Sequence, residues 1–103
     1  MTIPFFKPQL DEAALVNVAD CLSNGWLTTG PWNEKFEQNL AKYFGGECEV
    51  ILVNSATAGL HLSLVAAGVG PGDEVIVPTL TFTATAEVVE MVGAKPIFVD
   101  INP

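Results

Sequence analysis

Apolar residues in the first part of the chain recur at the spacing of amphipathic helices. Between Asp11 and Ser23 they occupy i, i+3 and i+4 positions, namely Ala14, Leu15, Val18, Ala19 and Leu22. The pair Asn24-Gly25 is expected to end this helix. A second helix is predicted to begin at Pro31, because proline is favoured in a first turn, and its apolar stripe is Trp32, Phe36, Leu40 and Phe44.

The periodicity changes after residue 46. Three short, nearly continuous and β-branched apolar runs follow, at Val50–Val53, Glu74–Val77 and Pro96–Val99. Such runs are typical of parallel strands that are covered on both faces. Helical stretches separate them, at Ala56–Ala67 and Thr83–Val92. The order strand–helix–strand–helix–strand predicts two right-handed βαβ units, and hence an α/β fold with a three-stranded parallel sheet.

These two patterns divide the chain into two regions. Residues 1–46 are predicted to hold an extended arm, which contains two prolines, followed by the two amphipathic helices. Residues 47–103 are predicted to be the start of the α/β domain. An open three-stranded sheet leaves an edge and a face uncovered, so the chain is interpreted as the front portion of one larger, incomplete domain.

Charge limits the partners that this chain can have. Four lysines, no arginine and twelve acidic residues give a net charge of −8, so nucleic acid and anionic membrane surfaces are expected to be repelled. The N-terminus lacks a signal-peptide pattern, and no apolar run approaches the ~20 residues of a membrane span. Cys21 and Cys48 show no metal-binding or redox spacing and are expected to be reduced thiols. The prediction is a cytoplasmic protein without a metal site.

The segment NSATAGLH at 54–61 is a first candidate for chemistry, because its helix start is built almost entirely from small residues. If Ser55 is the N-cap, no Glu or Gln stands three residues later to complete a capping box. The amides of Ala56, Thr57 and Ala58 would then be available to an anion, which the helix dipole also favours. A plain capped helix whose small residues pack against a neighbouring strand explains the same residues.

The second candidate segment follows the apolar run at 74–77. Phe82 lies there among four threonines: Thr79, Thr81, Thr83 and Thr85. One aromatic side chain in a hydroxyl-rich loop is suited to stack on a planar ligand, although a core anchor is the commoner role of such a phenylalanine.

Several further residues receive structural interpretations. They are His61 as a buried helix residue, Asp100 as a turn cap, Asp73 and Glu74 as solvated turn residues, and Trp26 with Thr28-Thr29-Gly30 as anchors of the N-terminal helices. The alternatives left open are acid–base chemistry for His61, a functional role for Asp100, and a ligand or second-subunit contact for Trp26 and its loop.

Five motifs occur in a fixed order along the chain: TTGP, SATAGLHL, GPGDEVIVP, TFTATA and GAKPIFVD. In this order they resemble the start of the DegT/DnrJ/EryC1/StrS family, the pyridoxal-phosphate-dependent sugar aminotransferases of the aspartate-aminotransferase fold (fold type I). The resemblance implies that Thr57 and Ala58 hold the cofactor phosphate, beside Ser55 and Ala56, and that Phe82 stacks on the pyridine ring. It also implies a homodimer or higher homo-oligomer, a nucleotide-linked keto-sugar substrate and an amino-acid donor.

One departure from the family concerns the catalytic residue. The Schiff-base lysine of the family is expected downstream of Pro103, and none of the four lysines matches its position: Lys7, Lys35, Lys42 and Lys95. No catalytic residue is therefore assigned, and the chain alone is expected to be inactive. Two alternatives stay open: a sugar dehydratase of the same family, and a non-catalytic α/β domain that oligomerises through its apolar surface.

Overall fold

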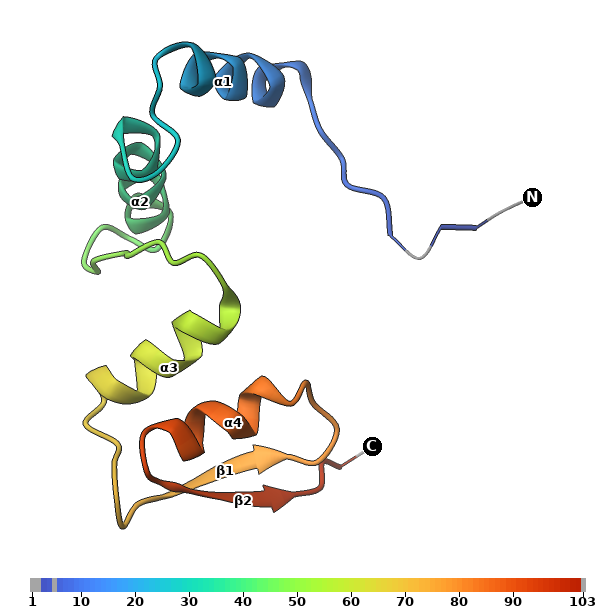
Figure 1. Ribbon diagram of the computed structural model, residues 1–103, viewed down its shortest axis with the longest axis vertical. Helices are drawn as coiled ribbons and strands as arrows, with labels where there is room; N and C mark the ends of the chain where they lie inside the picture. The colour runs from blue at the N-terminus through green and yellow to red at the C-terminus, as the bar shows by residue number, and fades with distance from the viewer. Residues whose placement is uncertain (1–2, 5, 103) are drawn as a thin grey trace. The chain divides into compact units, whose positions relative to one another are not determined.

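The computed structural model describes residues 3–4 and 6–102. Within them, four helices and two strands follow in the order α1, α2, α3, β1, α4, β2 (Figure 1). Contacts divide the chain into one compact unit that ends at Leu52 and a second that begins at Val53. The predicted division at residue 46, into an arm-and-helix region and an α/β domain, stays a prediction.

The first unit contains the two amphipathic helices. Helix α1 spans Glu12–Ser23 and is capped by Asp11, whose Oδ1 accepts a hydrogen bond from the Ala14 amide at 2.8 Å. It ends before Gly25, whose φ of 72° suits the left-handed turn that follows many helices. Helix α2 spans Pro31–Tyr43, with proline in its first turn. Both predicted helices are confirmed.

Side chains of α2 and of the connecting loop join the two helices. The Trp32 Nε1–H donates to Asp20 Oδ2 at 3.0 Å, and the Lys35 ammonium lies 4.5 Å from the centroid of the same indole. Trp26 packs on Gly30, where an added Cβ would stand 2.9 Å from the indole Cε3. Because Trp26 remains 54% exposed, it anchors its own loop rather than a buried helix core.

The predicted strand at Val50–Val53 is wrong. This segment is not a strand in the structure, and the described sheet is two-stranded rather than three-stranded. The reason is physical: a β-branched run favours extended backbone, but a strand exists only where a neighbouring strand accepts its ladder. Near the end of the first unit, the Leu52 amide instead donates to the Glu37 carboxylate of α2 at 2.8 Å.

The second unit is a helix followed by one βαβ motif. Helix α3 spans Ala56–Ala66, strand β1 Glu74–Pro78, helix α4 Ala84–Met91 and strand β2 Lys95–Val99. The strands are parallel, and Ile76 pairs with Ile97 at the centre of the register. The predicted helices and the last two predicted strands are confirmed, and with them the α/β class.

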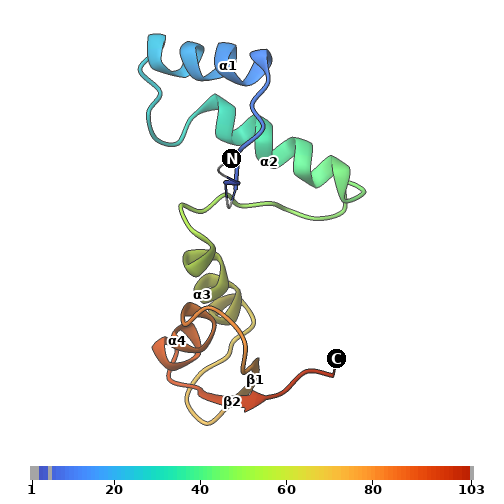
Figure 2. The same cartoon turned by 90° about the vertical axis from the view of Figure 1, so that its right-hand side faces the viewer.

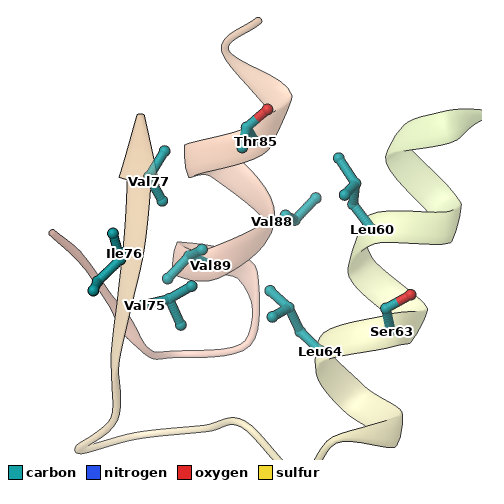
Figure 3. A pocket seen from close by; sticks show the side chains of 9 residues that line it. All are labelled: Leu60, Ser63, Leu64, Val75, Ile76, Val77, Thr85, Val88 and Val89. Atoms are coloured by element: carbon teal, nitrogen blue, oxygen red, sulfur yellow. The ribbon is translucent and has the colours of Figure 1, made fainter. Parts of the chain in front are cut away.

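The core of the second unit lies between α4 and the sheet. Figures 1 and 2 show α4 lying along one face of β1 and β2. Val77, Val88 and Val89 are at most 2% exposed there. Figure 3 shows Val75 and Val77 directed from β1 toward α4 and Ile76 directed to the other side, where it is 73% exposed. One face of the sheet is therefore covered within the unit and the other is open.

Helix α3 packs against α4 in the second unit. A pocket of 150 Å³ lies where residues of α3, β1 and α4 meet (Figure 3). Its lining is almost wholly apolar, with Ser63 and Thr85 as the hydroxyl-bearing members. The candidate residues of this unit lie at the start of α3 and in the loop that precedes α4.

Candidate functional site

The candidate segments of the second unit lie at the carboxyl edge of its sheet. Figure 1 shows α3 and α4 both beginning on the side toward which β1 and β2 point. The loop that contains Phe82 leaves β1 at this edge, and Asp100 follows β2 there. Ligands of open α/β sheets bind outside the carboxyl ends of the strands, so this edge is where a ligand is expected.

Helix α3 begins with a complete side-chain cap. Ser55 is its N-cap, with extended dihedrals (φ −158°, ψ 155°), and its hydroxyl oxygen accepts from the Ala58 amide at 3.2 Å. The same hydroxyl lies 3.3 Å from Asn54 Oδ1, to which it donates. The expectation that the Ala58 amide is left available is therefore wrong, because the cap itself uses that donor.

Two amides of the first turn have no hydrogen-bond partner within the described residues. The amides of Ala56 and Thr57 precede the first capped donor, and the side chains of both residues are exposed. The first turn contains no acidic residue, so the positive end of the helix dipole is not neutralised there. Small side chains at Ala56 and Ala58 leave the backbone open to close approach. The donor set of this turn, two amides and the Thr57 hydroxyl, fits a phosphate.

Phe82 does not act as a core anchor within the second unit. Its side chain is 78% exposed, in the loop between β1 and α4. The loop is closed by backbone hydrogen bonds and by a pair of threonine hydroxyls, Thr81 Oγ1 and Thr85 Oγ1, 2.9 Å apart. Sequence reasoning named these threonines but missed the pair, although their i, i+4 spacing across a helix start is a usable signal. The exposed ring leaves a face free for a planar ligand.

The remaining candidates take structural positions. His61 is half-buried on α3 rather than fully buried. Asp100 Oδ1 accepts from the amide of the next residue, Ile101, at 2.9 Å, and no turn follows β2 within the described residues, so the role of Asp100 as a turn cap stays a prediction. Asp73 Oδ2 accepts from the Gly70 amide at 2.9 Å in the turn before β1. None of these contacts creates a site for proton transfer.

The comparisons with known proteins fit this geometry. A family model described as the DegT/DnrJ/EryC1/StrS aminotransferase family matches residues 8–103. The chain belongs to this family. A relative, the UDP-4-amino-4-deoxy-L-arabinose–oxoglutarate aminotransferase of Shewanella sediminis, is 44% identical over 100 residues, which cover 97% of this chain and 26% of that protein. The chain thus spans about a quarter of the length of that relative.

Solved structures of similar proteins share the fold of the described chain. Spr1654 of Streptococcus pneumoniae, described as a sugar aminotransferase and solved in PMP and PLP forms, matches with a TM-score of 0.87 and 46% identity over 99% of this chain and 26% of that chain. The GDP-4-keto-6-deoxy-D-mannose-3-dehydratase of E. coli matches with a TM-score of 0.87 at 24% identity, over 98% of this chain and 27% of that chain, and shows the fold alone.

The described residues lack two other kinds of site. Among residues 3–4 and 6–102, no three His, Cys, Asp or Glu side chains gather in a way that could hold a metal ion. In the same part of the chain, no helix combines the length and the apolar character needed to cross a membrane. Cys21 and Cys48 are free thiols. The carboxyl edge of the sheet therefore stays the candidate site.

Proposed function

We propose that the protein to which this chain belongs is a pyridoxal-phosphate-dependent aminotransferase, acting on a nucleotide-linked keto-sugar with an amino acid as donor. The observation that carries the proposal is the pairing, at one sheet edge, of a capped helix start with open amides and an exposed aromatic ring. Membership of the aminotransferase family supports the same chemistry. When bound, pyridoxal phosphate supplies an electron sink for breaking bonds at the donor's α-carbon.

The residues of this chain would hold the cofactor at two ends. The amides of Ala56 and Thr57 and the Thr57 hydroxyl would donate to the phosphate, while Ser55 keeps the helix start in place through its cap. Ala58 would contribute through its small side chain, which lets the phosphate approach the backbone, while its amide stays bonded to Ser55. Phe82 would cover one face of the pyridine ring.

No lysine of this chain is proposed to attach the cofactor. Lys95 begins β2, at the amino end of the sheet, where its ammonium pairs with Glu74 at 2.9 Å. A five-residue strand is about 16 Å long, and Lys95 stands at its amino end. Lys95 therefore lies far from the carboxyl edge of the sheet, where the Phe82 loop begins. Lys35 lies over the Trp32 ring in the first unit. We therefore expect the chain alone to bind the cofactor non-covalently and not to transfer amino groups.

Exposed apolar side chains support an oligomer of the complete protein. In the first unit, Leu15, Leu22, Phe36 and Phe44 are each more than half exposed. Apolar surface of this kind is commonly covered by a partner. We propose a homodimer or higher homo-oligomer, which the sedimentation behaviour of the complete protein would test.

Ligand binding by the full 103-residue chain tests the cofactor proposal. Titrations with pyridoxal 5′-phosphate, inorganic phosphate and pyridoxal are followed by amide NMR shifts and by calorimetry. We expect both phosphate compounds to shift the Ala56 and Thr57 amides and pyridoxal to bind more weakly than pyridoxal phosphate. Shifts confined to other parts of the chain would refute the phosphate site.

A pair of variants tests the role of the ring. Phe82→Ala should weaken pyridoxal phosphate binding about threefold to tenfold, the range expected for loss of one aromatic contact, without changing inorganic phosphate binding. Leu80→Ala is the matched control, because Leu80 lies in the same loop and is 87% exposed. Equal losses in both variants would show that the ring has no specific contact.

A further inference from the structure

The loop that presents Phe82 is not held by burial of its large side chains. Leu80 is 87% exposed and Phe82 is 78% exposed, although both are apolar. Burial of such side chains is the usual way to fix a loop to its domain. The contacts that the described structure shows in this loop are hydrogen bonds of its backbone and its threonine hydroxyls.

Backbone hydrogen bonds fix only the two ends of this loop. At its start, the Thr79 amide donates to the Val99 carbonyl at 3.0 Å and extends the ladder beyond β1. At its end, the Phe82 carbonyl accepts from the Thr85 amide at 3.0 Å in the first turn of α4. Thr83, the N-cap residue of α4, makes no side-chain cap bond. The start of α4 therefore lacks the side-chain hydrogen bond that an N-cap threonine commonly accepts from the first turn of its helix.

A pair of threonine hydroxyls instead links the loop to the first turn of α4. Thr81 Oγ1 and Thr85 Oγ1 lie 2.9 Å apart, within hydrogen-bond distance, and the pair spans Phe82. Thr81 is exposed, whereas Thr85 is half-buried and lines the apolar pocket between α3, β1 and α4 (Figure 3). The exposed end of the pair is thus attached to a residue that the packing of the second unit holds in place.

We propose that Thr81 and Thr85 are positioning residues that hold the Phe82 ring for ligand stacking. The inference rests on the proposed function, since it gives these hydroxyls a role in the same cofactor site. A rigid loop would present the ring in one orientation, so binding would not have to order it first. The pair contacts neither phosphate nor ring in this account, and its effect passes through the Phe82 backbone.

Loop order in the absence of ligand is the first test. Backbone ¹⁵N relaxation is measured in the full chain and in Thr81→Val, which replaces the hydroxyl by a methyl of similar shape. The order parameter of the Phe82 amide should fall from the rigid range of about 0.85 toward 0.6, whereas Thr81→Ser should keep the wild-type value. Thr79→Val is the matched control, because the Thr79 hydroxyl makes no hydrogen bond within the described residues. An unchanged order parameter in Thr81→Val would overturn the role of the pair, whatever the chain binds.

Ligand selectivity is the second test. Thr81→Val and Thr85→Val should each bind pyridoxal phosphate about threefold to tenfold more weakly, the loss expected for one hydrogen bond, and bind inorganic phosphate as the wild type does. The double variant should lose no more than either single variant, because both remove the same bond. If Thr81→Val disorders the loop but leaves the pyridoxal phosphate affinity unchanged, the proposed role of the hydroxyl pair in the cofactor site is overturned. A wild-type chain that binds no pyridoxal phosphate, with the loop still disordered by Thr81→Val, would instead refute the proposed function.

Discussion

A negative charge placed at the start of α3 should move stability and anion binding in opposite directions. Ala58 is the third residue of the helix, so Ala58→Glu completes a capping box with Ser55. Ala58→Gln completes the same box without the charge, and Glu and Gln have similar helix propensities. The comparison of these two variants therefore isolates the charge from size, cap and propensity.

The expected magnitudes follow from the geometry of the first turn. The helix dipole should make Ala58→Glu more stable than Ala58→Gln by about 0.3–1 kcal/mol. An anion on the Ala56 and Thr57 amides would lie within one helical turn of the new carboxylate, about 5 Å away. At that distance two unit charges repel by about 0.8 kcal/mol in a water-like dielectric and more where water is excluded. A phosphate that carries nearly two charges should therefore bind about tenfold more weakly or worse.

Urea unfolding and calorimetric titration with inorganic phosphate measure the two effects. Ala66→Glu and Ala66→Gln at the last residue of α3 form the positional control, since they add the same charge at the opposite pole. There the glutamate should lower stability by about 0.3–1 kcal/mol relative to the glutamine and leave phosphate binding unchanged. Equal phosphate affinities of Ala58→Glu and Ala58→Gln would refute the anion site at the start of α3.

Three further predictions concern the packing and caps of the chain. Val89→Ala should lower the free energy of unfolding by about 2 kcal/mol in urea titrations, because two fully buried methyl groups are lost, whereas Ile76→Ala on the open sheet face should cost far less. Lys95→Met should change stability by less than about 1 kcal/mol, and by nothing measurable in high salt, because both partners of the Glu74 pair are mostly exposed. Asp11→Ala should destabilise α1 by about 1 kcal/mol, seen as lost helical signal in far-UV circular dichroism; an unchanged signal would contradict the cap.

Local rules were sufficient to predict the helices. The spacing of apolar residues and the turn signals determine α1 and α2 within the chain itself, so Asp11 and Asn24-Gly25 mark the ends of α1 correctly. The short βαβ motif was predictable for a similar reason, because β1, α4 and β2 are consecutive and contact one another. These elements depend on neighbours that are close in sequence.

The run at 50–53 shows where sequence patterns fail. Its residues favour extended backbone, but strand pairing requires two segments. The residue pattern of one segment does not identify the segment with which it pairs. In the second unit, β1 and β2 pair with each other, and the ladder of this sheet does not include the earlier run. A strand prediction from composition therefore needs a partner before it becomes a sheet.

The candidate site was predictable in its parts but not in its hydrogen bonds. The small residues of the α3 start and the aromatic ring of Phe82 were visible in the sequence. The sequence did not reveal which backbone amide the Ser55 cap would use, since the Ala58 amide bonds to Ser55 only in the folded helix. The exposure of Phe82 and the Thr81–Thr85 pair are likewise properties of the folded loop, which the sequence pattern does not state.

The candidate phosphate site at the start of α3 consists of neutral donors in a chain whose net charge is −8. Most phosphate sites lined by Lys or Arg lose affinity as ionic strength rises, because salt screens the attraction. Here the long-range field of the protein opposes the anion, while the short-range hydrogen bonds and dipole attract it. Added sodium chloride should therefore speed phosphate association until chloride itself competes for the amides, and the association rate should pass through a maximum with ionic strength.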